Sequence, residues 1–146
     1  NKYEEYDANE ELYLEFYNTL QDMIKTPTFD FDIVTHFDLP KKFNKRVENN
    51  KLIMEKVVET LELIKKRNLT VEINTSGLRK EIKEQYPSEE IIREMYDLDI
   101  PILLGSDAHQ PKEIAYKFKE TTNLLKNIGY NQLVHFEKRK RSYLDI

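Results

Sequence analysis

Two short segments of this chain place a histidine two residues from an aspartate, directly after a predicted strand. His36 and Asp38 form the first pair, and Asp107 and His109 form the second. Residues i and i+2 of an extended chain point to the same face, so the second pair would converge beyond its strand. Carboxylate oxygens and imidazole nitrogens are a common ligand mix for divalent metals. We therefore expect His36, Asp107 and His109 to hold a metal, which would lower the pKa of a bound water and polarise a phosphoryl oxygen.

Other polar residues are expected at the same end of the predicted strands. Arg79 lies in a glycine-containing loop, where its forked guanidinium either holds a phosphate or lies on the surface. Lys41 and Lys42 follow the first histidine and either add positive charge to the site or form a solvated basic loop. Glu72 and Asn74 alternate onto one face of their strand and either line the same mouth or form a polar layer inside a barrel. The spacing favours part of a metal-dependent hydrolase with an anionic substrate.

The composition argues against several other classes of protein. The 146 residues include no cysteine, which excludes disulfides and thiolate metal sites. The formal net charge of −4 argues against a general nucleic-acid binder, and a solvated tail explains the basic run Lys138–Arg141 as well. The third histidine, His135, is expected to be structural. No apolar run is long enough to span a membrane, and we expect a cytoplasmic protein.

Helical and strand patterns alternate along the chain. Four segments have apolar residues at helical spacing, and four short apolar or β-branched segments are typical of strands. The predicted helices cover residues 9–25, 48–67, 89–97 and 111–128, and the predicted strands cover residues 31–35, 70–74, 101–104 and 133–136. This alternation indicates parallel β-α-β units, and three or four strands are too few to close a barrel. We expect a single α/β domain over residues 1–146, with parallel strands and flanking helices.

Three stretches of the chain resemble a known family. They are Val34–Leu39, Glu72–Arg79 and Gly105–His109. In order and spacing they are similar to the histidinol-phosphatase branch of the PHP (polymerase and histidinol phosphatase) family. The string from Glu72 to Arg79 resembles that branch in particular, whereas Ser-Asp-Ala-His marks the wider family.

The resemblance implies a fold and a reaction. The family fold is a distorted seven-stranded β/α barrel with usually three divalent metals at its C-terminal mouth. By this resemblance, His36, Asp107 and His109 are metal ligands, Asp107 and His109 take part in catalysis, and Arg79 and Lys42 bind the substrate phosphate. Such enzymes usually have arginine at the position of Lys42, and lysine cannot make the same two-pronged contact. The implied reaction is the hydrolysis of L-histidinol phosphate to L-histidinol and phosphate in histidine biosynthesis.

The resemblance covers nearly the whole chain but only one half of such a barrel. Family members begin with a His-x-His strand followed by further histidine and glutamate ligands, and these motifs are absent here. The chain is therefore expected to be the C-terminal half of the barrel. We expect this half alone to bind metal weakly and to be nearly inactive. Its unpaired sheet edges would make it dimerise, swap strands or associate with the missing N-terminal half.

Two other functions fit the same residues. One is a PHP-type phosphoesterase that acts on another substrate, such as a nucleotide. The other is a non-catalytic α/β module that serves protein interaction and binds no metal at His36, Asp107 and His109. The ligand types do not select among zinc, manganese and iron, and an intact site of this family holds up to three such ions.

Overall fold

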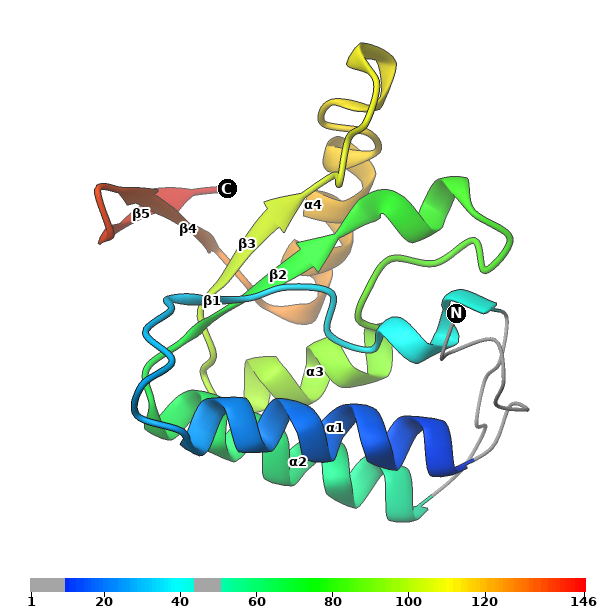
Figure 1. The fold of residues 1–146 in the computed structure, drawn as a ribbon. Helices are drawn as coiled ribbons and strands as arrows, with labels where there is room; N and C mark the ends of the chain where they lie inside the picture. The colour runs from blue at the N-terminus through cyan, green and yellow to red at the C-terminus, as the bar shows by residue number, and fades with distance from the viewer. Residues whose placement is uncertain (1–9, 44–50) are drawn as a thin grey trace.

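A three-stranded parallel sheet with helices between its strands forms the centre of the structure (Figure 1). The structure is a computed structural model that describes residues 10–43 and 51–146. In chain order its elements are α1 (Glu10–Lys25), β1 (Ile33–Val34), η2 (Leu39–Phe43), α2 (Lys51–Lys66), β2 (Thr70–Asn74), η3 (Thr75–Arg79), α3 (Glu89–Asp97), β3 (Ile102–Gly105), η4 (Pro111–Glu113), α4 (Phe118–Ile128), β4 (Gln132–Glu137) and β5 (Lys140–Asp145), where η marks a 3-10 helix. The predicted α/β class with flanking helices is confirmed.

Strands β1, β2 and β3 lie side by side in the order of the chain and all run parallel. Val34 of β1 pairs with Val71 of β2, and Asn74 at the end of β2 pairs with Gly105 of β3. Helix α2 connects the first two strands and α3 connects the second two, as parallel pairing requires. The C-terminal ends of the strands therefore meet at one edge of the sheet.

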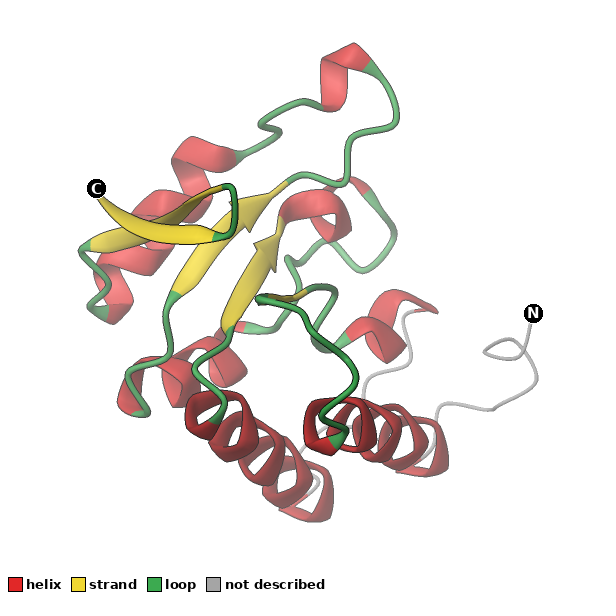
Figure 2. Ribbon diagram, turned by 60° about the vertical axis from the view of Figure 1, so that its left-hand side comes forward, coloured by secondary structure: helices red, strands yellow, loops and turns green. Residues whose placement is uncertain are grey.

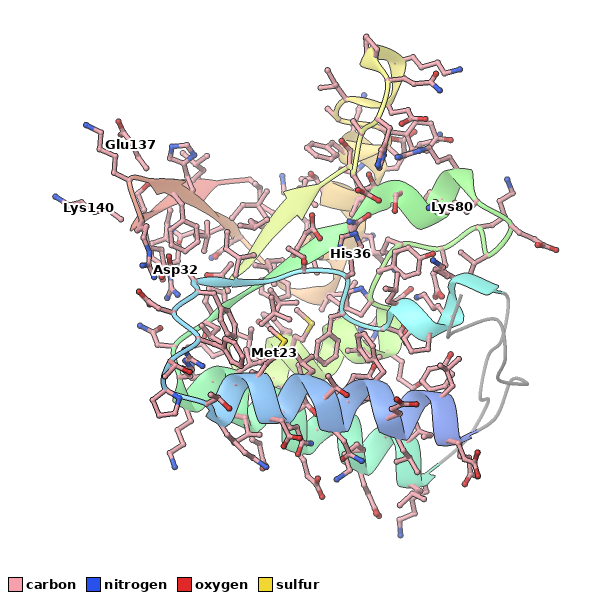
Figure 3. The ribbon with its side chains drawn as sticks, in the orientation of Figure 1. Met23, Asp32, His36, Lys80, Glu137 and Lys140 are labelled. Carbon is pink, nitrogen blue, oxygen red and sulfur yellow. The ribbon has the colours of Figure 1, made fainter. Side chains whose placement is uncertain are left out.

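A hairpin of β4 and β5 is bonded to the segments that precede β1 and β2, at the N-terminal ends of these strands. The two strands are antiparallel, and Figure 2 shows the hairpin in front of the three-stranded sheet. Arg139 in the hairpin turn bonds to the carboxylates of Asp30 and Asp32, which precede β1 (Figure 3). Arg141 on β5 donates to the side chain and backbone oxygen of Asn68, which precedes β2. The tail is therefore a clamped hairpin instead of a solvated basic run.

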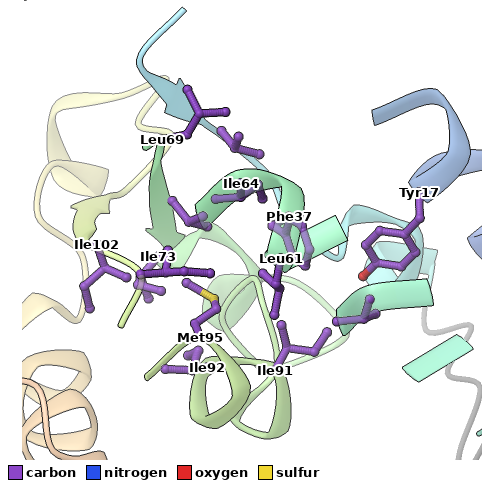
Figure 4. Packing of buried hydrophobic residues seen from close by; sticks show 14 of the residues in the cluster. Tyr17, Phe37, Leu61, Ile64, Leu69, Ile73, Ile91, Ile92, Met95 and Ile102 are labelled. Carbon is purple, nitrogen blue, oxygen red and sulfur yellow. The ribbon is translucent and has the colours of Figure 1, made fainter. Parts of the chain in front are cut away.

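The core lies between the sheet and the helices α1, α2 and α3, which lie on the same side of it (Figure 1). Ile73 of β2 and Ile102 of β3 are fully buried there against residues of the helices (Figure 4). Helix α2 contributes Val57, Leu61 and Ile64, whose spacing of three and four residues places them on one helical face. Burial of each large aliphatic side chain stabilises the fold by about 1.5–3 kcal/mol.

The face of the sheet that points away from these helices is only partly covered. Glu72 and Leu103 pair across β2 and β3 and share this face, and both remain partly exposed. Next to Glu72 on the same strand face, Thr70 and Asn74 are fully buried. The face thus carries a mixture of apolar and polar side chains near the edge where the strands end.

Some predicted boundaries differ from the structure. The helix predicted from Pro111 begins only at Phe118, because Ala115 and Lys117 adopt left-handed conformations with φ of 54° and 58° that interrupt it. The strand predicted over residues 31–35 is reduced to the two residues of β1, and β5 was not predicted at all. The first residue of the helix predicted over residues 9–25, Asn9, lies outside the described residues. Within residues 10–43 and 51–146, no helix has the length and apolar character needed to cross a membrane.

Candidate metal and phosphate site

Two of the predicted metal ligands meet at the C-terminal edge of the sheet. His36 follows β1 and Asp107 follows β3, and His36 Nε2 lies 3.6 Å from Asp107 Oδ2 (Figure 3). Both residues have positive φ, 53° for His36 and 48° for Asp107. This left-handed conformation is uncommon outside glycine and is concentrated at functional turns. The sharp turns at the two strand ends bring an imidazole and a carboxylate together across β2, which lies between them.

One ring nitrogen of His109 is anchored by a neighbouring backbone carbonyl group. Its Nδ1 lies 2.8 Å from the backbone oxygen of Asp107. A carbonyl oxygen can only accept, so Nδ1 carries the ring proton and Nε2 of the neutral ring keeps its lone pair. Histidines that bind metals commonly have their second ring nitrogen anchored in this way. The local geometry of His109 therefore suits a ligand that acts through Nε2.

The three candidate ligands do not form a complete metal shell. Across the part of the chain that the structure describes, no three His, Asp or Glu side chains converge closely enough to hold an ion. His36 and Asp107 converge, and His109 is on the same loop as Asp107 without joining them. Imidazole nitrogen and carboxylate oxygen are suitable ligands for a divalent metal, but the ligands that converge here are fewer than a complete coordination shell needs.

Glu72 connects the three strand ends beneath this pair. Its Oε2 accepts a hydrogen bond from the backbone N–H of His36 at 3.3 Å and from Asn74 Nδ2 at 3.0 Å. A Cβ atom placed on Gly105 would come within 2.7 Å of Glu72 Cδ, so the side chain lies directly on the glycine. Asn74 in turn accepts from the backbone N–H of Ser76 through its side-chain oxygen. Glu72 is therefore a brace between the ends of β1, β2 and β3.

Arg79 reaches the same edge and holds the loop after β3. Its Nη1 donates to the backbone oxygen of Ser106 at 2.7 Å, and its Nη2 donates to that of Asp107 at 2.8 Å. Nη2 also lies 3.4 Å from Glu113 Oε2. These contacts occupy three of the five N–H groups of the guanidinium. The guanidinium thus lies against the backbone of Asp107, and the contacts named here leave two of its N–H groups.

The two lysines after β1 have different environments. Lys41 is 2% exposed, and its Nζ contacts Asp38 Oδ2 at 3.0 Å, Glu84 Oε2 at 2.9 Å and the Gln85 backbone oxygen at 2.7 Å. Lys42 is the next residue on η2 and is partly exposed. Lys41 is therefore part of the buried framework, and Lys42 is the lysine of this pair that stays accessible.

The aspartate of the first His-x-Asp pair does not belong to the site. Asp38 is 4% exposed, and it accepts a hydrogen bond from the backbone N–H of Ser88 in addition to its ion pair with Lys41. Burial raises the pKa of the Asp38 carboxyl group, although Lys41 opposes this shift. Spacing alone could not distinguish Asp38 from Asp107, because both follow a strand.

Two residues near the site were not singled out from the sequence. Glu113 accepts a hydrogen bond from the backbone N–H of His109, which lowers the pKa of Glu113 together with the charge of Arg79. Its position just after Pro111, where a helical turn begins, was the available signal. Tyr86 is fully buried, and its hydroxyl has no hydrogen-bond partner among the described residues. Burial, with the charges of Asp38 and Asp107, raises the pKa of Tyr86 to about 12.

Comparisons with known proteins place the chain beside phosphatases. No family model matches it. A probable histidinol-phosphatase from Deinococcus radiodurans is 32% identical over 139 residues, which are 95% of this chain and 50% of that protein. A Listeria monocytogenes crystal structure assigned to a histidinol phosphatase has a TM-score of 0.70 at 28% identity, over 76% of this chain and 44% of the other.

A second solved structure covers more of the fold. Histidinol phosphate phosphatase from Lactococcus lactis, in complex with zinc, L-histidinol and phosphate, has a TM-score of 0.76 at 21% identity. The match covers 91% of this chain and 51% of that one. The chain therefore spans about half the length of the relatives that it matches.

Proposed function

We propose that this chain, which is similar to probable histidinol-phosphatases, supplies one half of a metal-dependent phosphatase of the PHP family. The proposed reaction is the hydrolysis of L-histidinol phosphate to L-histidinol and phosphate, in the histidine biosynthesis of the cytoplasm. The observation that carries this proposal is the approach of His36 Nε2 to Asp107 Oδ2, 3.6 Å apart, beyond two strands of a parallel sheet. In β/α folds, active sites are built at this end of the strands.

In this proposal the residues of the site have separate roles. His36, Asp107 and His109, through Nε2, would hold metal, which supplies an activated water and polarises the phosphoryl group. Asp107 and His109 are thereby the catalytic residues of this half. Arg79 would bind the substrate phosphate with its remaining N–H groups, and Lys42 would add a second positive charge. The zinc complex of the Lactococcus relative makes zinc the first metal to test, before manganese and iron.

We further propose that the chain is the C-terminal half of a seven-stranded barrel and forms a single domain over residues 1–146. Its relatives are about twice as long, and within the described residues β1 and β3 each pair with β2 alone in the parallel sheet. The partly exposed face around Glu72 and Leu103 would then be the barrel interior. The missing half would complete the metal shell, of which two candidate ligands converge within the residues that the structure describes. The isolated chain would bind metal weakly and have very low activity.

The test is phosphate release by the chain alone and by the chain joined to an upstream half from its parent gene or from a close relative. We expect turnover of L-histidinol phosphate only in the completed protein, with His109→Ala abolishing it. His135→Ala is the matched control, since His135 lies on the exposed face of the hairpin strand β4. A panel of nucleotides and other phosphate esters tests the substrate. If the completed protein hydrolyses a nucleotide faster than L-histidinol phosphate, the nucleotide replaces L-histidinol phosphate as the proposed substrate. A completed, folded protein without bound metal or turnover would contradict the proposal and favour an interaction module.

A further inference from the structure

The carboxylate of Glu113 joins the two elements that carry the candidate phosphate and metal residues. Its Oε2 accepts the backbone N–H of His109 at 2.9 Å and lies 3.4 Å from Arg79 Nη2. The Glu113 side chain is 18% exposed and that of Arg79 is 17% exposed, so both groups are largely removed from solvent. A single carboxylate oxygen therefore connects η3, which carries Arg79, with the loop that carries His109.

The loop around His109 has few other constraints. Between β3 and η4 the chain has no regular structure, and Asp107 adopts a left-handed conformation. The imidazole of His109 is exposed, and its recorded contact is with the backbone oxygen of Asp107. That contact requires the Asp107 carbonyl and the His109 backbone to keep one relative orientation. Arg79 holds the carbonyl, and Glu113 holds the His109 N–H.

We propose that Glu113 is a positioning residue that fixes the backbone of His109, and thereby keeps its imidazole in the Nδ1–H form with Nε2 available as a ligand. The relevance of this role for catalysis rests on the proposed phosphatase function. The geometry itself rests on the contacts of Glu113, Arg79, Asp107 and His109 in the chain. Because hydrogen bonds to charged groups are stronger than those between neutral groups, loss of this carboxylate should loosen the loop measurably.

Two substitutions separate the hydrogen bond from the charge. Glu113→Ala removes the acceptor for the backbone N–H groups of His109 and Gln110 and the partner of Arg79. Glu113→Gln keeps an acceptor oxygen of the same reach and removes only the charge. Glu120→Ala is the matched control, because Glu120 is an exposed glutamate in the first turn of helix α4, where its side chain pairs with Lys117.

The experiment is nuclear magnetic resonance on the 146-residue chain. It measures the exchange rate of the His109 amide proton and, from the nitrogen chemical shifts of the ring, the tautomer of His109. The melting temperature of each variant is measured beside it. In Glu113→Ala we expect exchange of the His109 amide to be about tenfold faster or more. We also expect loss of the Nδ1–H preference, at a melting temperature close to that of the wild type. Glu113→Gln should restore most of the protection and the tautomer, and Glu120→Ala should change neither. Unchanged exchange and tautomer in Glu113→Ala would overturn the proposal, as would failure of Glu113→Gln to restore them.

These readouts need neither metal nor substrate, so they are independent of the proposed function. In the completed protein, Glu113→Ala should lower kcat about tenfold or more with a smaller change in KM, and Glu113→Gln should recover most of kcat. If the wild-type completed protein has no phosphatase activity while the resonance results hold, the proposed function fails and the positioning role stands. If the completed protein is active and the resonance results fail, the proposed function stands and the positioning role of Glu113 is wrong.

Discussion

At the scale of single residues, burial separates two neighbouring lysines that look alike in the sequence. Lys41 has its ammonium group in contact with two carboxylates and a backbone oxygen, and its side chain is 3% exposed. Removing one partner of a buried ion pair leaves the other charge uncompensated, which is far more costly than the pair itself is favourable. Lys41 therefore has a structural role, and Lys42 is left as the candidate for phosphate binding.

We expect Lys41→Ala to destabilise the chain by about 3–5 kcal/mol, because the buried carboxylate of Asp38 loses its counter-charge. Urea unfolding followed by circular dichroism measures this change. Lys112→Ala is the control, since Lys112 is exposed, and its effect should stay within about 0.5 kcal/mol. Equal stability of the Lys41→Ala and Lys112→Ala variants would show that the buried ion pair is not needed.

The sequence predicted which strand ends meet better than it predicted the direction of each side chain. The spacing identified His36 and Asp107, which the structure brings together, because residues after neighbouring parallel strands meet at one edge. The same rule also marked Asp38, which turns into the interior toward Lys41. Side-chain direction after a left-handed residue depends on tertiary contacts that the spacing does not encode. The metal roles of His36, Asp107 and His109 remain predictions.

At the scale of elements, the close approach of Glu72 to Gly105 aligns the strand ends. We expect Gly105→Ala to destabilise the chain by about 1–3 kcal/mol, because the new methyl group overlaps the Glu72 side chain and displaces it from the His36 N–H. The amide resonance of His36 should shift in this variant. Thermal unfolding and a proton–nitrogen spectrum measure the two effects.

A double-mutant cycle provides the control for this contact. Glu72→Ala removes the overlapping side chain, so the double variant Glu72→Ala/Gly105→Ala should be less destabilised than the sum of the two single variants. Strict additivity would mean that Gly105 is required for a reason other than the approach of Glu72.

The β4–β5 hairpin gives a prediction with a defined pH dependence. The hydrogen bonds and charge of Arg139 lower the pKa of Asp30 and of Asp32 below the ordinary value of 3.8. Because the folded pKa is depressed, the stabilisation is present above the pKa of the unfolded chain and is lost as the pH falls through the folded value. Arg139→Ala should therefore lower stability at neutral pH, and its difference from the wild type should shrink below pH 3.8.

Urea midpoints of the wild type and Arg139→Ala over a pH series measure this difference. Arg139→Lys is a useful companion variant, because lysine keeps the charge but lacks the planar fork with which Arg139 bonds to both oxygens of Asp30 and also to Asp32. If the difference in stability between the wild type and Arg139→Ala grows on acidification, the ion pairs of Arg139 with Asp30 and Asp32 do not stabilise the fold.

Elements were predictable where periodicity was strong. The strand at 70–74 and the helix at 89–97 have the bounds expected from the sequence, since the strand is buried on both faces and the helix buries one apolar face. The helix start at residue 111 was wrong because Ala115 and Lys117 adopt left-handed conformations that interrupt the helix, and the apolar spacing does not encode these conformations. Strand β5 was missed because nearly all of its residues are exposed and its stability comes from pairing with β4.

At the scale of the whole molecule, the three-stranded parallel sheet has two edges without a partner strand in the described residues. In the described residues the parallel sheet ends at β1 on one side and at β3 on the other, and unpaired sheet edges favour association. We expect the isolated chain to form dimers or strand-swapped species, and the missing half to convert them into a one-to-one complex. Sedimentation velocity with and without the upstream half measures this. A stable monomer of the isolated chain would contradict the prediction.

The measurement that tests the account most directly is a zinc titration of the isolated chain, followed through its imidazole resonances. The chain has three histidines, and His135 on β4 is an internal control. We predict that zinc shifts the signals of His36 and His109 together, that the signals of His135 stay unchanged, and that Asp107→Ala weakens the response. No response of His36 and His109, or an equal response of all three histidines that Asp107→Ala does not alter, would contradict a metal site at this edge of the sheet.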